Sequence, residues 1–372
     1  MKWNRLAVTT YFFVNGFLYA NWAARLPEMQ QFYNISNTRL GSLLLTMAAG
    51  AILAMPFTGW LTTRFSTRTV TILAGLGFCI SVPFLVISPS FWIYTSVFFM
   101  MGLFSGAMDV AMNGQAVFVE RLYAKPIMSS FHAMFSIGMA LGAGAGALFA
   151  KFTLPLWDHL LLVSLIGLGS HLLAFRYLIR DQPEQSTGRG GHFQLPTKAI
   201  LPLGIMAFCG MTGEGAMADW SAIFMNTVVG QNEAFSALTF GTFAAAMTIG
   251  RLFGDHFTGR YGARQVLIFD SSLALVGLGL LLAFPLIWTT FLGFFLTGLG
   301  LSTVVPIVYS KAGNTPGVGP SAGIAMATTI GYTGFFVGPP VIGFLSDLYG
   351  LRFALTMVLL LFAIMWWLVR RI

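Results

Sequence analysis

The chain is built largely from apolar stretches of about 20 residues, the length that crosses the hydrocarbon core of a bilayer as an α-helix. These stretches are about twice as long as the strands of a membrane barrel and lack the alternation of such strands. The sequence therefore predicts an all-α integral membrane protein. The predicted spans cover residues 6–26, 40–62, 69–88, 91–118, 129–150, 156–179, 199–228, 235–257, 265–284, 286–310, 321–345 and 352–370.

The composition excludes a soluble enzyme. Only 9% of the residues are charged and 56% are hydrophobic, whereas a soluble domain carries about 25% charged residues. The same apolar content excludes a disordered chain. The net charge of +8 is spread over short connections instead of forming one basic patch, so we expect a membrane topology signal and no nucleic-acid partner.

The positive charges predict the orientation, because cytoplasmic loops are enriched in Lys and Arg. With a cytoplasmic N-terminus, the outside loops hold only Arg25, Arg39, Lys151 and Arg352. The inside segments hold Lys2, Arg5, Arg64, Arg68, Arg121, Lys125, Arg176, Arg180, Arg189, Lys198, Arg260, Arg264, Lys311, Arg370 and Arg371. We therefore expect a multi-pass protein of the cytoplasmic (inner) membrane with both termini in the cytoplasm.

The longest hydrophilic break, residues 181–198, divides the chain into two groups of six spans, 1–180 and 199–372. Its composition is that of a flexible cytoplasmic linker. The two groups resemble each other at a nearly constant offset, which predicts two pseudo-symmetric six-helix bundles. At an offset of 196, Thr46, Arg64, Arg68, Trp92 and Gly102 recur as Thr242, Arg260, Arg264, Trp288 and Gly298.

The connection between the second and third spans resembles the signature loop of the major facilitator superfamily, G-x-L-x-D-R-x-G-R-R. Gly59, Leu61, Arg64 and Arg68 match it, while Thr63 and Ser66 replace the signature Asp and Gly. A second copy keeps Arg260, Gly262 and Arg264 but has Gly259 in place of Asp. The resemblance implies the major facilitator fold, with a substrate site near mid-membrane between the two halves.

Three further stretches, residues 106–113, 130–138 and 214–221, resemble the MosC/YbjJ-like branch of this superfamily. This resemblance implies a small polar solute, and the family expectation is a monomer. Its implied partners are the solute, protons and the lipid bilayer.

Ionisable residues inside spans are costly and are functional candidates by default. Asp109 lies in the fourth span, Asn113 is one turn further on the same face, and His132 opens the fifth span on the same side of the membrane. We expect these residues to bind substrate or couple protons. The alternative is that Asp109 pairs with an arginine and only fixes packing.

The seventh span carries Glu214, Asp219 and Trp220. Glu214 lies nearer to mid-membrane and is the better candidate for a proton carrier, whereas Asp219 could simply face the outer water. In the first span, Tyr11, Asn15, Tyr19 and Trp22 lie on one helical face, and Asn21 matches Asp219 in the repeat. This face either lines a cavity for a hydroxylated solute, with Trp220 opposite, or packs between helices.

Charged residues at the ends of the spans are candidates for conformational gating. Arg251 and Asp255 are spaced i, i+4 and are predicted to pair. The others are Arg64, Arg68, Arg260 and Arg264, whose alternative role is positive-inside anchoring. Glycine ladders, Gly102–Gly106 and Gly138–Gly142–Gly146, predict close helix crossings.

The sequence contains no phosphate-binding loop and no His–Cys metal cluster, so we expect no cofactor, no metal, no ATP-driven transport and no enzymatic activity. The function predicted is secondary active transport of a sugar-like, polyol-like or amino-sugar-like solute by alternating access, as proton-coupled symport. The alternatives are a proton-driven exporter of a metabolite or drug and a non-transporting membrane sensor.

Overall fold

The computed structural model describes residues 1–35, 37–181, 196–231 and 233–370. All regular secondary structure in these ranges is helical, which confirms the predicted class. Residues 182–195 of the predicted linker lie outside the described residues. The helices are α1 (Lys2–Ala23), α2 (Leu26–Tyr33), α3 (Asn37–Arg64), α4 (Thr67–Phe84), α5 (Phe91–Tyr123), α6 (Met128–Lys151), α7 (Leu156–Ala174), the 3-10 turn η1 (Phe175–Tyr177), α8 (Leu201–Thr227), α9 (Glu233–Tyr261), α10 (Ala263–Ala283), α11 (Ile287–Leu301), α12 (Val304–Gly313), α13 (Pro320–Tyr349) and α14 (Leu351–Val369).

Twelve spans account for all of these helices except the short α2 in the described part of the chain. Eight are long and apolar enough to cross a membrane, with α11 and α12 together forming one of them, Ile287–Gly313. The other four are α1, α8, α9 and α13, of 22, 27, 29 and 30 residues. At 1.5 Å per residue each of these can cross the roughly 30 Å hydrocarbon core. Three of the four carry the charged and amide residues singled out above, which lowers their hydropathy.

The chain forms two compact units. Unit 1 comprises Met1–Ala124, Phe131–Leu195 and Gly313–Met326, and unit 2 comprises Lys125–Ser130, Pro196–Ala312 and Ala327–Ile372. Two short segments, Lys125–Ser130 and Gly313–Met326, thus belong to the unit formed mainly by the other half of the sequence. The division at residues 181–198 into two bundles stays a prediction.

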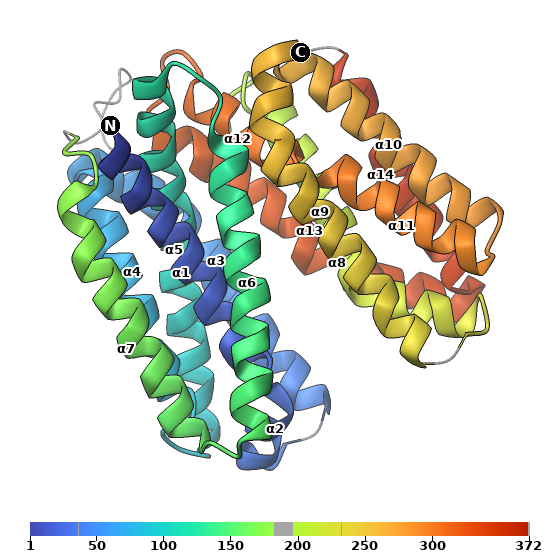
Figure 1. Ribbon diagram of the computed structural model, residues 1–372, viewed down its shortest axis with the longest axis horizontal. Helices are drawn as coiled ribbons and strands as arrows, with labels where there is room; N and C mark the ends of the chain where they lie inside the picture. Colours follow the sequence, from blue (N-terminus) through green and yellow to red (C-terminus); the bar gives the residue numbers. More distant parts are fainter. Residues whose placement is uncertain (36, 182–195, 232, 371–372) are drawn as a thin grey trace. The chain divides into compact units, whose positions relative to one another are not determined.

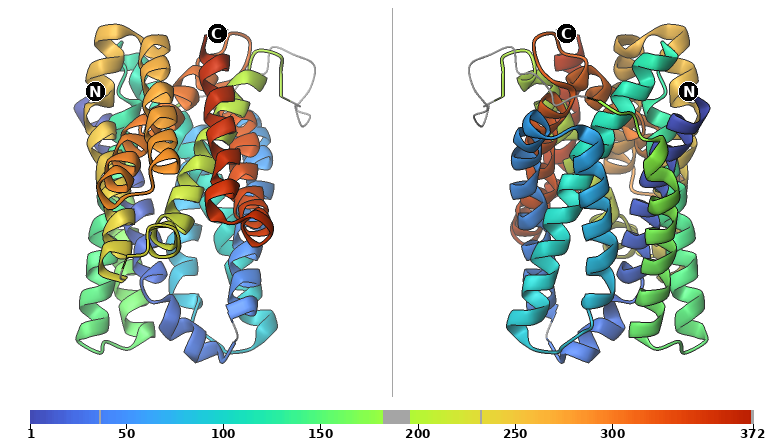
Figure 2. Two further views of the ribbon diagram at one scale, coloured as in Figure 1. Left: turned by 90° about the vertical axis from the view of Figure 1, so that its right-hand side faces the viewer. Right: turned by 90° about the vertical axis from the view of Figure 1, so that its left-hand side faces the viewer.

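The same helix pairs pack in both units (Figures 1 and 2). In unit 1, α5 packs against α3 and α4, and α7 packs against α1 and α4. In unit 2, α11 packs against α9 and α10, and α14 packs against α8 and α10. Each pair in unit 2 is the repeat counterpart of a pair in unit 1, so the two six-helix halves are pseudo-symmetric.

The glycine ladders lie at close helix crossings, as predicted. A Cβ atom on Gly102 would lie 2.0 Å from the carbonyl oxygen of Met47 on α3. On Gly138 it would lie 2.2 Å from the carbonyl oxygen of Phe13 on α1. The repeat extends to this contact, since a Cβ on Gly298, the counterpart of Gly102, would lie 2.5 Å from the carbonyl oxygen of Phe243. Only glycine allows the backbones to approach this closely.

The two copies of the signature loop differ in conformation. Gly262 forms a one-residue connection between α9 and α10 with φ at 84°, a left-handed conformation that favours glycine. Ser66, which replaces the signature glycine in the first copy, has φ at −65°, and its hydroxyl accepts a hydrogen bond from the backbone N–H of Thr69 at 3.2 Å. The first copy therefore uses an N-cap where the second uses a left-handed glycine.

The predicted span 286–310 is interrupted. Helix α11 ends at Leu301, Ser302 and Thr303 form a turn, and α12 begins at Val304. Pro306 explains the interruption, because proline has no N–H to donate to the carbonyl of Ser302 and its ring crowds that carbonyl. The corresponding helix of unit 1, α5, continues for 33 residues.

Candidate functional site

A hydrogen-bonded chain joins Asp109, Asn113 and His132 in unit 1. The side-chain amide of Asn113 donates to the backbone oxygen of Asp109 at 2.8 Å and to its carboxylate Oδ1 at 3.2 Å. The amide oxygen therefore faces Nε2 of His132 at 3.2 Å and accepts a hydrogen bond from its N–H. Asn113 is fully buried, and His132 is 8% exposed. The expected approach of His132 to Asp109 thus occurs through Asn113.

Helix α1 closes one side of this group. The amide nitrogen of Asn15 lies 3.8 Å from the sulfur of Met112, beside Asn113 on α5. The ring of Phe12 packs edge-on against His132, with centroids 5.2 Å apart. Asp109 itself is only half-buried. A carboxylate, an amide and an imidazole from α5 and α6 therefore form a polar group of three predicted site residues, and a fourth, Asn15, lies on α1 against the neighbouring Met112.

Asn21 belongs to a different network. Its amide oxygen accepts a hydrogen bond from Nε2 of His159 at 2.9 Å, and its nitrogen donates to the backbone oxygen of Phe17. The guanidinium of Arg25 lies 3.1 Å from Nδ1 of His159 and forms an ion pair with Glu28. Because a guanidinium only donates, Nδ1 of His159 accepts and Nε2 carries the proton. This buried network ties α1 and α2 to α7, and it occupies both ends of the Asn21 amide.

The aromatic face predicted on α1 divides among different environments. Tyr11 is fully buried and stacks on His171 of α7 at 4.1 Å, so it packs in the bundle interior instead of lining a cavity. Trp22 is 1% exposed and packs edge-on against Phe98. Tyr19 packs edge-on against Trp22 at 5.1 Å and is half-buried. The residues share a helical face but lie in different surroundings, and Asn15 contacts Met112, the residue before Asn113.

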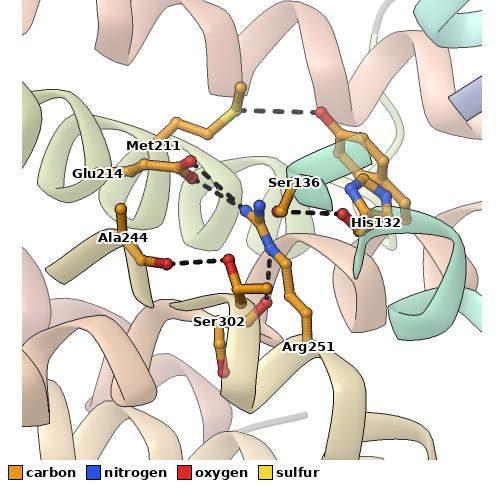
Figure 3. Close-up of polar contacts among 9 residues, drawn as sticks. His132, Ser136, Met211, Glu214, Ala244, Arg251 and Ser302 are labelled. Carbon is orange, nitrogen blue, oxygen red and sulfur yellow. Dashed lines mark hydrogen bonds and ion pairs between the residues drawn. The ribbon is translucent and has the colours of Figure 1, made fainter. Parts of the chain in front are cut away.

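Unit 2 holds a charge pair between α8 and α9. One guanidinium nitrogen of Arg251 lies 3.4 Å from both carboxylate oxygens of Glu214. Nε of Arg251 donates to the carbonyl oxygen of Ser302 at 3.4 Å. Figure 3 shows the guanidinium between the Glu214 carboxylate and the Ser302 carbonyl. Arg251 thus satisfies the carbonyl that Pro306 leaves without its helical donor.

Asp255 has partners on a neighbouring helix. Its carboxylate oxygens accept hydrogen bonds from the backbone N–H groups of Ser129 and Ser130, both at 2.8 Å. These two N–H groups belong to the first turn of α6, where a negative charge also complements the helix dipole. Each of Arg251 and Asp255 thus has partners on neighbouring helices, and their pairing at the i, i+4 spacing stays a prediction.

Asp219 and Trp220 differ in exposure. Asp219 is exposed and Trp220 is half-buried. A Cβ atom on Gly343 of α13 would lie 3.7 Å from the Trp220 ring, so this indole packs on a helix of its own unit. Neither residue contacts Glu214 in the structure as described.

The four remaining gating candidates make local contacts. Arg68 donates to the backbone oxygen of Phe175 at 3.3 Å, and its counterpart Arg264 donates to that of Arg370 at 2.7 Å. Both arginines thus bind the carbonyl end of the last helix of their half, which complements its dipole.

The other two gating candidates lie over aromatic rings. Arg64 lies over the ring of Trp60, and Arg260 lies over that of Tyr261. The gating role of all four arginines stays a prediction.

Sequence reasoning missed Asp270, a carboxylate inside the ninth predicted span. It is 6% exposed and accepts a hydrogen bond from the hydroxyl of Thr303, the second residue of the turn between α11 and α12. The signal was present, because the rule that selected Asp109, an ionisable residue inside a span, applies equally to Asp270.

No group of three or more metal-ligating side chains occurs in the ranges that the structure describes. Cys79 and Cys209 are both buried and free.

Comparison with known families agrees with this architecture. The sequence model of the Major Facilitator Superfamily matches residues 8–319. The chain belongs to the major facilitator superfamily. It is therefore a membrane transporter, and its two six-helix halves are those of the major facilitator fold.

Two relatives resemble this transporter along almost its whole length. An uncharacterized MFS-type transporter of Yersinia pestis is 34% identical over 350 residues, covering 94% of this chain and 91% of the relative. The membrane protein MosC of Rhizobium meliloti is 31% identical over 356 residues, covering 95% and 86%. The resemblance to the MosC-like branch is thereby confirmed.

Solved structures show the same fold. The transporter FucP in its outward conformation has a TM-score of 0.84 at 16% identity, covering 98% of this chain and 97% of that chain. The human organic anion transporter MFSD10 has a TM-score of 0.80 at 16% identity, covering 99% of both chains. At this level of identity the likeness concerns the fold.

Proposed function

We propose that this transporter moves a small polar solute across the cytoplasmic membrane by alternating access, in symport with protons. The observation that carries the proposal is the chain Asp109–Asn113–His132. A half-buried carboxylate linked to a buried imidazole offers both a proton-binding group and acceptors for hydroxyl or amine hydrogens. Ionisable groups inside membrane spans typically mark solute and proton pathways.

The charge pair in unit 2 supports a neutral or amine-bearing solute. Arg251 is occupied by Glu214 and by the carbonyl of Ser302, so its charge is already partly balanced within the protein. A strong anion would need a cation that is not already paired. The structural relative FucP is a fucose:proton symporter, which agrees with a sugar-like or polyol-like solute.

The test is proton movement in proteoliposomes that contain a pH-sensitive dye, screened against polyols, sugars and amino sugars. Solute should drive protons inward and make the outside more alkaline. Asp109→Asn should reduce this signal to the level of empty vesicles, because the amide cannot bind the proton. Asn113→Leu should weaken it as strongly, because it disconnects His132 from Asp109.

The control variant is Asp347→Asn, since Asp347 is exposed near the end of α13 and should transport like the wild type. Solute uptake without proton movement would refute symport and leave uniport. If no solute of the panel enters, export of an internal metabolite or drug, or sensing without transport, replaces uptake as the working function.

We further propose that Asp255 stabilises one conformation of the transport cycle by holding the first turn of α6. Asp255→Asn should weaken that contact and destabilise the first turn of α6 by about 1 kcal/mol, the typical value of a capping interaction. Hydrogen–deuterium exchange of residues 128–132 should rise in Asp255→Asn and stay unchanged in the neighbouring exposed variant His256→Asn. Unchanged exchange in Asp255→Asn would contradict this role.

A further inference from the structure

The interruption of the tenth span is held from two sides in unit 2. On one side Arg251 donates to the carbonyl of Ser302, and on the other the hydroxyl of Thr303 donates to the carboxylate of Asp270. Ser302 and Thr303 are 1% and 3% exposed. The junction between α11 and α12 thus depends on two buried charged side chains from two neighbouring helices, α9 and α10.

The two charged side chains are balanced differently. Arg251 has the carboxylate of Glu214 as a counter-ion. Among the described residues, Asp270 has the Thr303 hydroxyl as its polar partner and no cation within ion-pair distance. A carboxylate buried in a membrane span without a counter-ion is costly unless it binds a proton or a cation.

The helices packed against α10 supply no counter-ion for Asp270. Helix α11 contains no charged residue, and α14 contains only Arg352, at its start, where the guanidinium donates to the backbone oxygens of Leu282 and Ala283 at the far end of α10. Helix α12 carries Tyr309 and Lys311. Helix α9 carries Arg251, Asp255, His256 and Arg260, and α10 itself carries Arg264, which binds the carbonyl of Arg370. The cation nearest to the junction by its contacts is therefore Arg251.

Helices α10 and α11 are in close backbone contact beside Asp270. A Cβ atom on Gly300 would lie 2.4 Å from both the backbone oxygen of Asp270 and the backbone nitrogen of Ala274. Helices α10 and α11 therefore cross in backbone contact two residues before the interruption. This contact places the backbone of Asp270 close to the junction that contains Thr303.

We propose that Asp270 is a proton-binding residue of this transporter and that its protonation loosens the junction between α11 and α12. An ionised Asp270 accepts the hydrogen bond of Thr303. When a proton binds, the acid keeps a carbonyl oxygen that can accept from Thr303, but the hydrogen bond loses its charge assistance and becomes a weaker neutral one, so one of the two ties at the junction is weakened. Discontinuous helices are the parts of transporters where ion binding is converted into movement.

The coupling role rests on the proton-coupled transport proposed above, whereas proton binding at Asp270 does not. The experiment therefore uses the purified full-length protein in liposomes, without solute and without a gradient. Infrared difference spectra are recorded while the buffer is stepped from mildly alkaline to mildly acidic. Protonation of Asp270 should appear as a carboxylic-acid C=O band, which Asp270→Asn lacks and the exposed control Asp347→Asn retains.

The environment of the band identifies its origin even if Asp270→Asn folds poorly. Thr303→Val removes the hydrogen-bonding hydroxyl and should shift the band frequency, while Thr303→Ser should keep it. Deuterium exchange of residues 299–308 should respond to pH more strongly in the wild type than in Asp270→Asn. A band that persists in Asp270→Asn, or that is the same in Thr303→Val and Thr303→Ser, would overturn the proposal. Failure of solute-driven proton movement would refute symport and leave this result standing.

Discussion

Leucine at Gly102 is expected to prevent unit 1 from reaching its native packing. The Cβ atom alone would lie 2.0 Å from the carbonyl oxygen of Met47, which is backbone and cannot turn away. Helices α3 and α5 would have to separate, and we expect a loss of about 3 kcal/mol, at the upper end of overpacking costs. Thermal unfolding in detergent, with size-exclusion profiles, measures the effect.

The matched control is Gly144→Ala on α6. A Cβ atom there has no atom within 4 Å, and alanine favours a helix over glycine by up to about 1 kcal/mol. This variant should be as stable as the wild type or slightly more stable. If Gly102→Leu melts like Gly144→Ala, the backbone contact between α3 and α5 is not what the structure indicates.

Removing Arg251 is expected to be the most damaging change to the charges of unit 2. In Arg251→Met, the Glu214 carboxylate loses its counter-ion and the Ser302 carbonyl loses its donor. Breaking a largely buried ion pair by removing one partner costs about 3 kcal/mol. Arg251 is 7% exposed, which places it in this class. Thermal unfolding and transport should both decline.

A double-mutant cycle separates the two effects of Arg251. Adding Glu214→Gln to Arg251→Met removes the unpaired carboxylate and should restore part of the stability, while the Ser302 carbonyl stays without a donor. Arg260→Met, an exposed arginine of the same helix, should change stability by no more than about 0.5 kcal/mol. Additive effects of Glu214→Gln and Arg251→Met would show that the two side chains do not interact in solution.

Much of the fold could be predicted from the sequence, because membrane helices are specified by local properties. The length of the apolar stretches set the spans, and the glycine spacing indicated where backbones approach, as at Gly102 and Gly138. The repeat also predicted which positions correspond, down to Arg68 and Arg264 on equivalent carbonyl groups. The short helix α2 was missed, since it lies in a connection too short to carry an apolar pattern.

Side-chain partners were harder to predict than the spans. The spacing along α9 favoured Arg251 with Asp255, and the additional partners of Arg251, on α8 and after α11, could not be predicted from that spacing. A sequence pattern describes neighbours on one helix, while a buried charge selects partners from all helices around it. For the same reason Tyr11 shares a helical face with Asn15 but stacks on His171, and the consequence of Pro306 for Ser302 became visible only with Arg251 beside it.

The assignment of two short segments to the unit of the opposite half has an evolutionary consequence. Residues 125–130 belong to the unit of the second half, where Asp255 holds the start of α6. Residues 313–326 belong to the unit of the first half, where Arg121 binds oxygen atoms of Gly313 and Asn314. If one ancestral bundle was duplicated and fused, each copy has since come to depend on a segment encoded by the other. The halves can no longer be shuffled between paralogues as independent modules, because a new partner would have to supply the missing segment as well as a compatible bundle.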